Sequence, residues 1–157
     1  MFITMARILR LLILCFINFT FMMAPKTTIH ISSFNCTGMK SSLEYISKSI
    51  CSQSDIIALQ EMWILPNEVE LCKTVHNEFT GFSKSSVDVE KGVLRGRPYG
   101  GLGFLWRSTL DAHVTPVAME EDRLLGLKVK TDTQELLIIN VYMPTQNNQN
   151  YDEYVNN

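Results

Sequence analysis

The amino-acid sequence predicts an α/β fold built around a mixed β-sheet. The first supporting observation is the apolar run at 55–61, which is bounded by polar residues and is typical of a buried central strand. The second is the alternating segment at 27–35, which a helical pattern separates from that run. A strand, a helix and a second strand in this order are expected to form a βαβ-like unit with parallel strands.

The first helix is expected directly after a turn at 36–38. Ser41 and Glu44 have the spacing of a capping box, which marks a helix start. The apolar stripe that follows consists of Leu43, Ile46 and Ile50. This helix would cover one face of the sheet.

A second helix is expected from Pro66, with Asn67 and Glu70 as a weaker capping pair and an end before Gly81. Its inner stripe would be Val69, Cys72 and Val75. The segment at 82–92 is polar and is expected to be extended. Further extended segments are expected at 102–107, 112–118, 124–130 and 136–142, and the last of these is predicted to be another central strand of the sheet.

Composition restricts the functions that are open to this chain. Its 157 residues suffice for one domain with a core. A formal net charge of −2 excludes a whole-protein attraction to nucleic acid, so any such binding has to come from a local patch. The cysteines show no metal-binding spacing and are expected to be reduced and mostly buried: Cys15, Cys36, Cys51 and Cys72.

The segment 1–23 has two interpretations, and both are kept. Arg7 and Arg10 precede an apolar run at 11–23, which is the outline of a signal peptide, but the cleavage site is poor. The run is too short for a stable membrane span. The alternative is a mis-called start codon at Met1, with translation beginning near Met22. The domain proper is placed at 24–157. The chain would be secreted under the first interpretation and intracellular, in the nucleus, under the second.

Polar side chains follow the apolar bodies of three predicted strands: Asn35, Glu61 and Tyr142. Strand ends at one edge of a sheet commonly build a site, because the sheet positions their side chains. A carboxylate beside an amide suits a hard cation such as Mg²⁺, and a phenol can donate a hydrogen bond to a phosphate oxygen. Each residue also has a structural interpretation. Asn35 can cap a turn, Glu61 can form an ion pair, and Tyr142 can be a core aromatic.

The motifs at these strand ends resemble those of the endonuclease/exonuclease/phosphatase superfamily. They are Phe34-Asn35, Leu59-Gln60-Glu61 and Asn140-Val141-Tyr142-Met143-Pro144. The segment at 96–107 makes the chain most similar to the endonuclease domain of non-LTR (LINE-type) retrotransposon proteins. The resemblance covers about residues 27–146.

The resemblance implies a metal-dependent phosphodiester hydrolase that acts on DNA. Glu61 would hold Mg²⁺ or Mn²⁺, Asn35 would support the metal and phosphate site, and Tyr142 would contact the scissile phosphate or the nucleophile. The basic residues expected to touch the DNA backbone are Arg95, Arg97 and Arg107. A solvated loop is the alternative interpretation for these cations.

The resemblance also implies an incomplete four-layer α/β sandwich, with one mixed sheet, helices on its outer face and the second half missing. The family's later Asp-x-Asn and Asp-His residues have no counterpart before Asn157, and the expected activity is absent or very weak. An exposed sheet face would then bind a protein partner or aggregate. Two alternatives stay open: a non-catalytic relic or interaction module, and a relative that acts on lipid or small-molecule phosphates.

Overall fold

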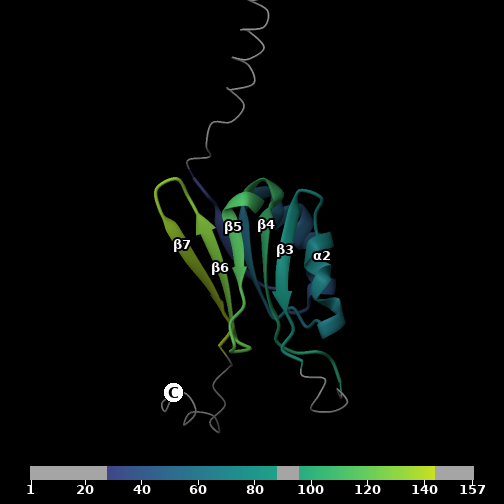
Figure 1. Ribbon diagram of the computed structural model, residues 1–157. Helices are drawn as coiled ribbons and strands as arrows, with labels where there is room; N and C mark the ends of the chain where they lie inside the picture. The colour runs from purple at the N-terminus through teal and green to yellow at the C-terminus, as the bar shows by residue number, and fades with distance from the viewer. Residues whose placement is uncertain (1–27, 88–95, 144–157) are drawn as a thin grey trace, which may run out of the picture.

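Two β-sheets face each other in the computed structural model, which describes residues 28–87 and 96–143 (Figure 1). The four-stranded sheet has the order β1 (Ile31–Asn35), β2 (Ile56–Gln60), β4 (Leu102–Arg107) and β3 (Phe79–Lys84). The three-stranded sheet has the order β5 (Val114–Val117), β6 (Leu124–Lys130) and β7 (Glu135–Val141). The helical segments are α2 (Met39–Tyr45), η1 (Ile46–Ile50), α3 (Cys51–Gln53), η2 (Pro66–Thr74) and η3 (Ser108–His113).

The four-stranded sheet is covered on both faces around β2, and this explains the continuous apolar run of that strand. β1 and β2 pair in parallel, as predicted, and β4 pairs antiparallel to β2. Ile57 and Leu59 point toward the helical layer, where they pack with Met39 and Ile46. The alternate side chains of β2 and β4 point toward the second sheet, in a cluster with Leu125, Leu127 and Val129. A strand that is buried on both faces has no polar side to display.

The predicted α/β class and the mixed sheet with helices on its outer face are confirmed. The expectation of one sheet with a missing second half is wrong for the described residues, because β5, β6 and β7 form a second sheet. The segment 136–142 was expected to be a central strand, but β7 pairs antiparallel with β6 alone. A short turn, closed by Thr131 N–H donating to the Gln134 carbonyl at 2.8 Å, connects the two strands and favours a hairpin.

Strand β3 was not predicted in its full length. Its inward positions are Phe79, Gly81 and Ser83, and small residues at two of them conceal the apolar alternation. Gly81 is needed for the close approach to β4, since a Cβ atom there would lie 2.7 Å from both Leu105 Cδ2 and the Phe104 carbonyl oxygen.

The helix ends also differ from the predicted caps. The first helix begins at Met39, two residues before Ser41, and the Ser41 hydroxyl donates to the Gly38 carbonyl at 2.8 Å instead of forming a capping box. The second helical segment is a 3₁₀ helix, and Glu68 accepts from the Leu65 N–H at its start. Its predicted inner residues Cys72 and Val75 are buried.

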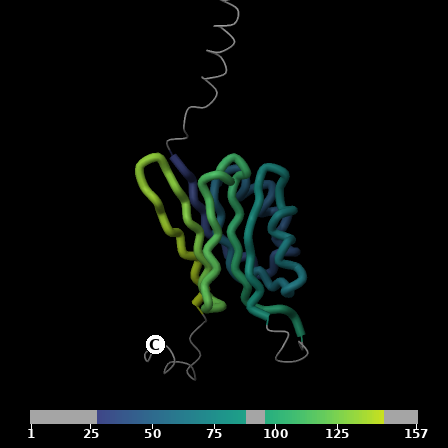
Figure 2. The backbone as a smooth tube through the Cα atoms, viewed as in Figure 1, coloured from purple at the N-terminus to yellow at the C-terminus, as the bar shows by residue number. Residues whose placement is uncertain are grey.

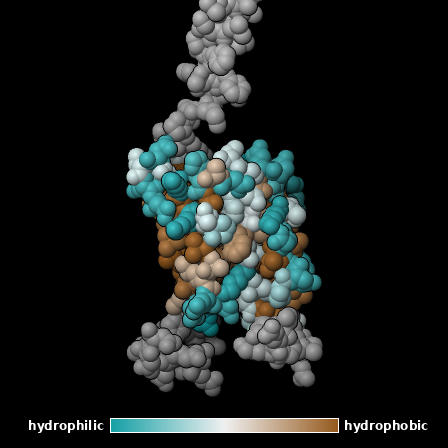
Figure 3. Space-filling model, in the orientation of Figure 1, coloured by the Kyte–Doolittle hydropathy of each residue, from teal (hydrophilic) through white to brown (hydrophobic). Residues whose placement is uncertain are grey.

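The outer face of the three-stranded sheet is apolar and exposed along β7. Leu137 and Ile139 are about half exposed, at 52% and 50%. Figure 3 shows brown surface on the left flank, where Figure 1 draws β6 and β7. Figure 2 shows the start of β1, in purple, beside β7, although the two strands come from opposite ends of the described chain. Among the described residues, no helix has the length and apolarity needed to cross a membrane.

Candidate functional site

The site lies at one edge of the two sheets, where β1, β2 and β7 end. Asn35 is the last residue of β1, Glu61 follows β2, and Tyr142 follows β7. The Asn35 side chain donates from Nδ2 to Glu61 Oε1 at 2.9 Å, and Tyr142 lies near enough that, with burial, Glu61 raises the pKa of its phenol. The structure therefore brings these three residues together. This edge is called the rim below.

The backbone at Glu61 is strained. Glu61 and Trp63 have φ angles of 49° and 51°, in the left-handed region that non-glycine residues rarely adopt. Such residues cost on the order of 1–3 kcal/mol each and persist where the surroundings hold them in place. Here the Glu61 carbonyl accepts the Gly38 N–H at 2.9 Å, and the Met62 N–H donates to the Gly101 carbonyl at 3.2 Å. Two neighbouring loops thus fix the direction of the Glu61 side chain.

The Asn35 amide orients Glu61 as well as its own loop. Its Oδ1 atom accepts the Thr37 N–H at 3.0 Å, so Nδ2 is the atom that turns toward the carboxylate. From the sequence, Asn35 could either cap a turn or support a metal site. The hydrogen bonds show that this one amide closes the turn and contacts Glu61.

Burial and the Glu61 charge raise the pKa values of two neighbouring side chains, Tyr142 and Cys36. Burial, followed by the hydrogen bond to Glu61 and the charge of Glu61, raises the pKa of Tyr142, although Arg123 acts in the opposite direction. Burial and the nearby Glu61 charge raise the pKa of the Cys36 thiol to about 12. At neutral pH the phenol is therefore a hydrogen-bond donor and the Cys36 thiol is neutral and unreactive.

Asn140 is a functional candidate that the residue-by-residue sequence reasoning missed. Its side chain is 2% exposed and spans the two sheets. Nδ2 donates to the Leu59 carbonyl at 2.8 Å and to the Gly103 carbonyl at 3.0 Å, and Oδ1 accepts from Gln60 Nε2 at 2.7 Å. The sequence signal for Asn140 is its place as an amide within the apolar stretch at 136–142. A buried amide there needs several hydrogen-bond partners.

A groove of about 510 Å³ runs from the rim between β1 and β7. Asn35, Gln60 and Tyr142 line it near the rim, together with Asn140. Ile31 and Ile138 line it farther away. A ligand that reaches the rim would thus meet amide and hydroxyl groups first.

The donor set at the rim fits a weakly chelated hard cation. Glu61 is the carboxylate there, and no group of three or more histidine, cysteine or acidic residues lies together in residues 28–87 and 96–143. Mg²⁺ commonly uses one or two carboxylates and keeps several waters, so one oriented carboxylate is compatible with it. No described lysine or arginine lies within salt-bridge distance of Glu61, which leaves its charge available.

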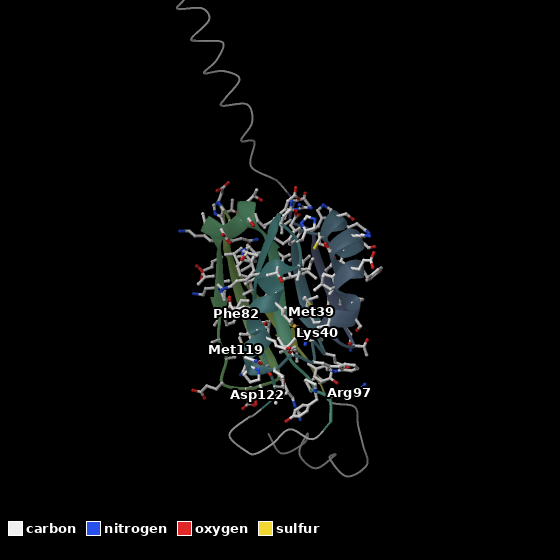
Figure 4. The ribbon with its side chains drawn as sticks, turned by 90° about the vertical axis from the view of Figure 1, so that its right-hand side faces the viewer. Met39, Lys40, Phe82, Arg97, Met119 and Asp122 are labelled. Carbon is white, nitrogen blue, oxygen red and sulfur yellow. The ribbon has the colours of Figure 1, made fainter. Side chains whose placement is uncertain are left out.

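The predicted cations are not brought together. Arg107 lies at the opposite end of the four-stranded sheet, about 17 Å away at the rise of a β-strand, and pairs with Asp55 at 3.1 Å and Glu78 at 2.9 Å. These two carboxylates neutralise the Arg107 charge within the fold, which disfavours a contact between Arg107 and DNA. Arg97 lies at the rim end, with its guanidinium carbon 3.9 Å from the centre of the Trp63 ring (Figure 4). Arg95 falls outside the described residues.

The histidines also lie away from the rim. His30, His76 and His113 stand just before β1, β3 and β5, which all run toward the rim. These three histidines therefore lie at the opposite edge from Asn35, Glu61 and Tyr142. Cys36, Cys51 and Cys72 are free and buried, as predicted, and Cys15 lies outside the described residues.

No protein-family model and no curated protein matches the sequence. Among solved structures, the chain is similar to the 3′ phosphatase NExo from Neisseria bound to product DNA hairpin, with 15% sequence identity and a TM-score of 0.49. The similarity covers 73% of this chain and 41% of that chain, so this chain spans less than half the length of that protein. At this identity, the chemistry of the rim has to be argued from its own residues.

Proposed function

We propose that the chain is part of a divalent-metal-dependent phosphodiester hydrolase of the DNA endonuclease type. The observation that carries this proposal is the Asn35–Glu61 hydrogen bond at the ends of β1 and β2, beside a groove that Asn35 and Tyr142 line together. The motif resemblance to retroelement endonucleases points to the same three residues. DNA is the proposed substrate, and Mg²⁺ or Mn²⁺ the proposed cofactor.

Glu61 is the proposed metal ligand, and Asn35 is the residue that orients it. The Asn35 hydrogen bond engages Oε1, so the rest of the carboxylate can face a cation. The metal, when bound, would supply charge stabilisation for a phosphodiester under attack by water. We assign Asn35 to positioning rather than to direct coordination, because its own oxygen accepts the Thr37 N–H.

Tyr142 is the proposed phosphate contact. Its raised pKa keeps the proton on the phenol at neutral pH, so the hydroxyl can donate to a non-bridging phosphate oxygen. Glu61 competes for this proton in the absence of ligand. A phosphate that enters the rim would thus replace a carboxylate as the acceptor.

The proposed catalysis by this chain alone is weak. The described histidines lie at the opposite edge, and the described part of the rim has Glu61 as its carboxylate, Tyr142 as its phenol and amide side chains. Loss of a general acid or base commonly lowers a rate by about 10²–10⁴. A slow nicking activity is therefore expected rather than rapid degradation.

A second candidate function is non-catalytic protein binding. The exposed apolar side chains along β7, at Leu137 and Ile139 among others, favour it. A chain of this type would bind a partner and leave DNA uncut.

Metal-dependent nicking of supercoiled plasmid tests the proposed function. The full chain is compared with Glu61→Gln, which keeps an acceptor for Asn35 but removes the charge, and with Glu44→Gln as a matched exposed control. We expect Glu61→Gln to lower the nicking rate at least about 100-fold and Glu44→Gln to leave it unchanged. Equal rates for the chain and Glu61→Gln would overturn the proposal.

A further inference from the structure

A stacked pair of side chains lies beside the rim and takes no part in the proposed chemistry. The Arg97 guanidinium carbon lies 3.9 Å from the centre of the Trp63 ring, which is within the range of a cation–π contact. Trp63 follows Glu61 by two residues, and Figure 4 places Arg97 at the lower end of the molecule, where β1, β2 and β7 finish. The pair therefore faces the same side as the rim.

The fold holds the Trp63 ring in place through its backbone and through Gly38. The Trp63 N–H donates to the Gly100 carbonyl at 2.9 Å, and the Trp63 backbone has a left-handed φ of 51°. A Cβ atom at Gly38 would lie 3.0 Å from Trp63 Cε3, so the ring packs against a position that needs a glycine. Gly38 also has a φ of 106°, which disfavours any other residue.

The stack leaves the charge of Arg97 available. Arg97 is exposed, and no acidic side chain in the described part of the chain lies within salt-bridge distance of it. Arg107 differs in this respect, because two carboxylates neutralise it. A guanidinium that rests on an aromatic face is immobilised while its N–H edges stay free, and those edges match two oxygens of a phosphate.

We propose that Trp63 and Arg97 form a phosphate clamp for the nucleic-acid backbone next to the proposed cleavage position. This inference rests on the proposed function for the identity of the ligand, a phosphodiester strand. Arg97 supplies two N–H donors to one backbone phosphate, and Trp63 fixes the plane of the guanidinium. Tyr99, 55% exposed and two residues from Arg97, offers a further aromatic surface on which a base can stack.

The test measures binding rather than cleavage. A fluorescein-labelled DNA oligonucleotide is titrated with the full chain in EDTA, at several salt concentrations, and anisotropy gives the affinity. We expect Arg97→Gln to weaken binding about tenfold and to reduce the slope of log affinity against log salt by about one. Lys130→Gln, which removes an exposed cation from the opposite edge, is the matched control and should change neither quantity.

Two further variants separate a clamp from a simple positive charge. Arg97→Lys keeps the charge but loses the planar fork, and Trp63→Leu removes the stacking face. We expect both to weaken binding about three- to fivefold. Circular dichroism and the melting temperature show whether Trp63→Leu has kept its fold, and Arg97→Lys tests the clamp without that risk. Full affinity in Arg97→Lys would overturn the clamp, as would an unchanged salt slope in Arg97→Gln.

The outcomes distinguish this inference from the proposed function. Glu61→Gln should lose nicking and keep its affinity in EDTA. If Glu61→Gln abolishes nicking but Arg97→Gln leaves DNA affinity unchanged, the clamp alone is overturned. Binding that depends on Arg97, in a chain without Glu61-dependent nicking, would support the clamp and overturn the catalytic proposal.

Discussion

Strand β2 carries a carboxylate at each end, and the two have different surroundings. Asp55 precedes the strand, is 2% exposed, and accepts hydrogen bonds from Arg107 Nε at 3.1 Å and from the His30 N–H at 2.9 Å. Glu61 follows the strand, is half-buried, accepts a hydrogen bond from the Asn35 amide and, with burial, raises the pKa of the nearby Tyr142 phenol. One acid has a cation beside it, and among the described residues the other has none within salt-bridge distance.

The difference separates a carboxylate that stabilises the fold from one that is available for a ligand. A buried carboxylate has to be paired, and the Asp55 contacts meet that requirement. Glu61 is held by neutral donors and by a strained backbone, which direct the carboxylate without neutralising it. Substitutions at the Asp55 end of β2 should therefore lower mainly stability. Substitutions at the Glu61 end should lower mainly activity.

The largest expected effect on stability is at the Asp55 end. Arg107→Ala removes a cation that contacts the buried Asp55 carboxylate and should lower the free energy of unfolding by about 3 kcal/mol. Glu61→Gln should change it by less than about 1 kcal/mol, because Gln can still accept from Asn35. Urea denaturation of the two variants checks the contrast. A larger loss in Glu61→Gln than in Arg107→Ala would contradict the assignment of the two roles.

A smaller loss is expected for the amide that supports the rim end of β2. Asn140→Ala leaves the Leu59 and Gly103 carbonyls and the Gln60 amide without a buried partner, which should lower stability by about 2–3 kcal/mol. The urea midpoint gives the value, and Asn77→Ala, at an exposed position, is the control. A change below about 0.5 kcal/mol would show that water replaces the amide at no cost.

The sequence was most informative where one local signal decided the structure. The apolar run before Glu61 is typical of a strand covered on both faces, and the intervening helix favoured parallel pairing with β1. The gathering of Asn35 and Glu61 was predictable for the same reason, since parallel neighbours end at one edge.

The remaining features depended on contacts between distant segments. β3 was missed because Gly81 and Ser83 occupy inward positions, which only the close approach of β4 explains. The second sheet was not expected, because its pairing joins β5, β6 and β7 through turns whose geometry composition does not specify. Arg107 was grouped with Arg97 by sequence proximity, and the antiparallel direction of β4 carries it to the opposite edge.

A third prediction concerns the stability of the fold at alkaline pH, which depends on the Cys36 thiol beside Glu61. Cys36 has a pKa of about 12 in the folded protein against an ordinary value of 9.0, because burial and Glu61 disfavour the thiolate. The stability from the buried neutral thiol is thus complete below pH 9 and is lost as the pH rises toward 12. Between pH 8 and 10.5 the loss assigned to Cys36 is roughly 2 kcal/mol.

Urea midpoints of the chain and of Cys36→Ala, measured in reductant at both pH values, isolate this contribution. The variant should be less stable at pH 8 but should lose less stability on going to pH 10.5. Parallel losses in the two proteins would show that the thiol does not titrate differently in the folded and unfolded states.

The smallest effect on stability is expected at Asn35. The same substitution separates a role in catalysis from a role in DNA binding most clearly. Asn35→Ala removes two exposed hydrogen bonds, to Glu61 and to the Thr37 N–H, and should lower stability by about 0.5–1 kcal/mol. The proposed role predicts a larger effect on chemistry, because the Glu61 carboxylate would lose the group that orients it. We expect the nicking rate at saturating Mg²⁺ to fall about tenfold or more, with DNA affinity in EDTA unchanged. A fall in affinity without a fall in rate would place Asn35 in strand binding and leave Glu61 oriented by its backbone alone.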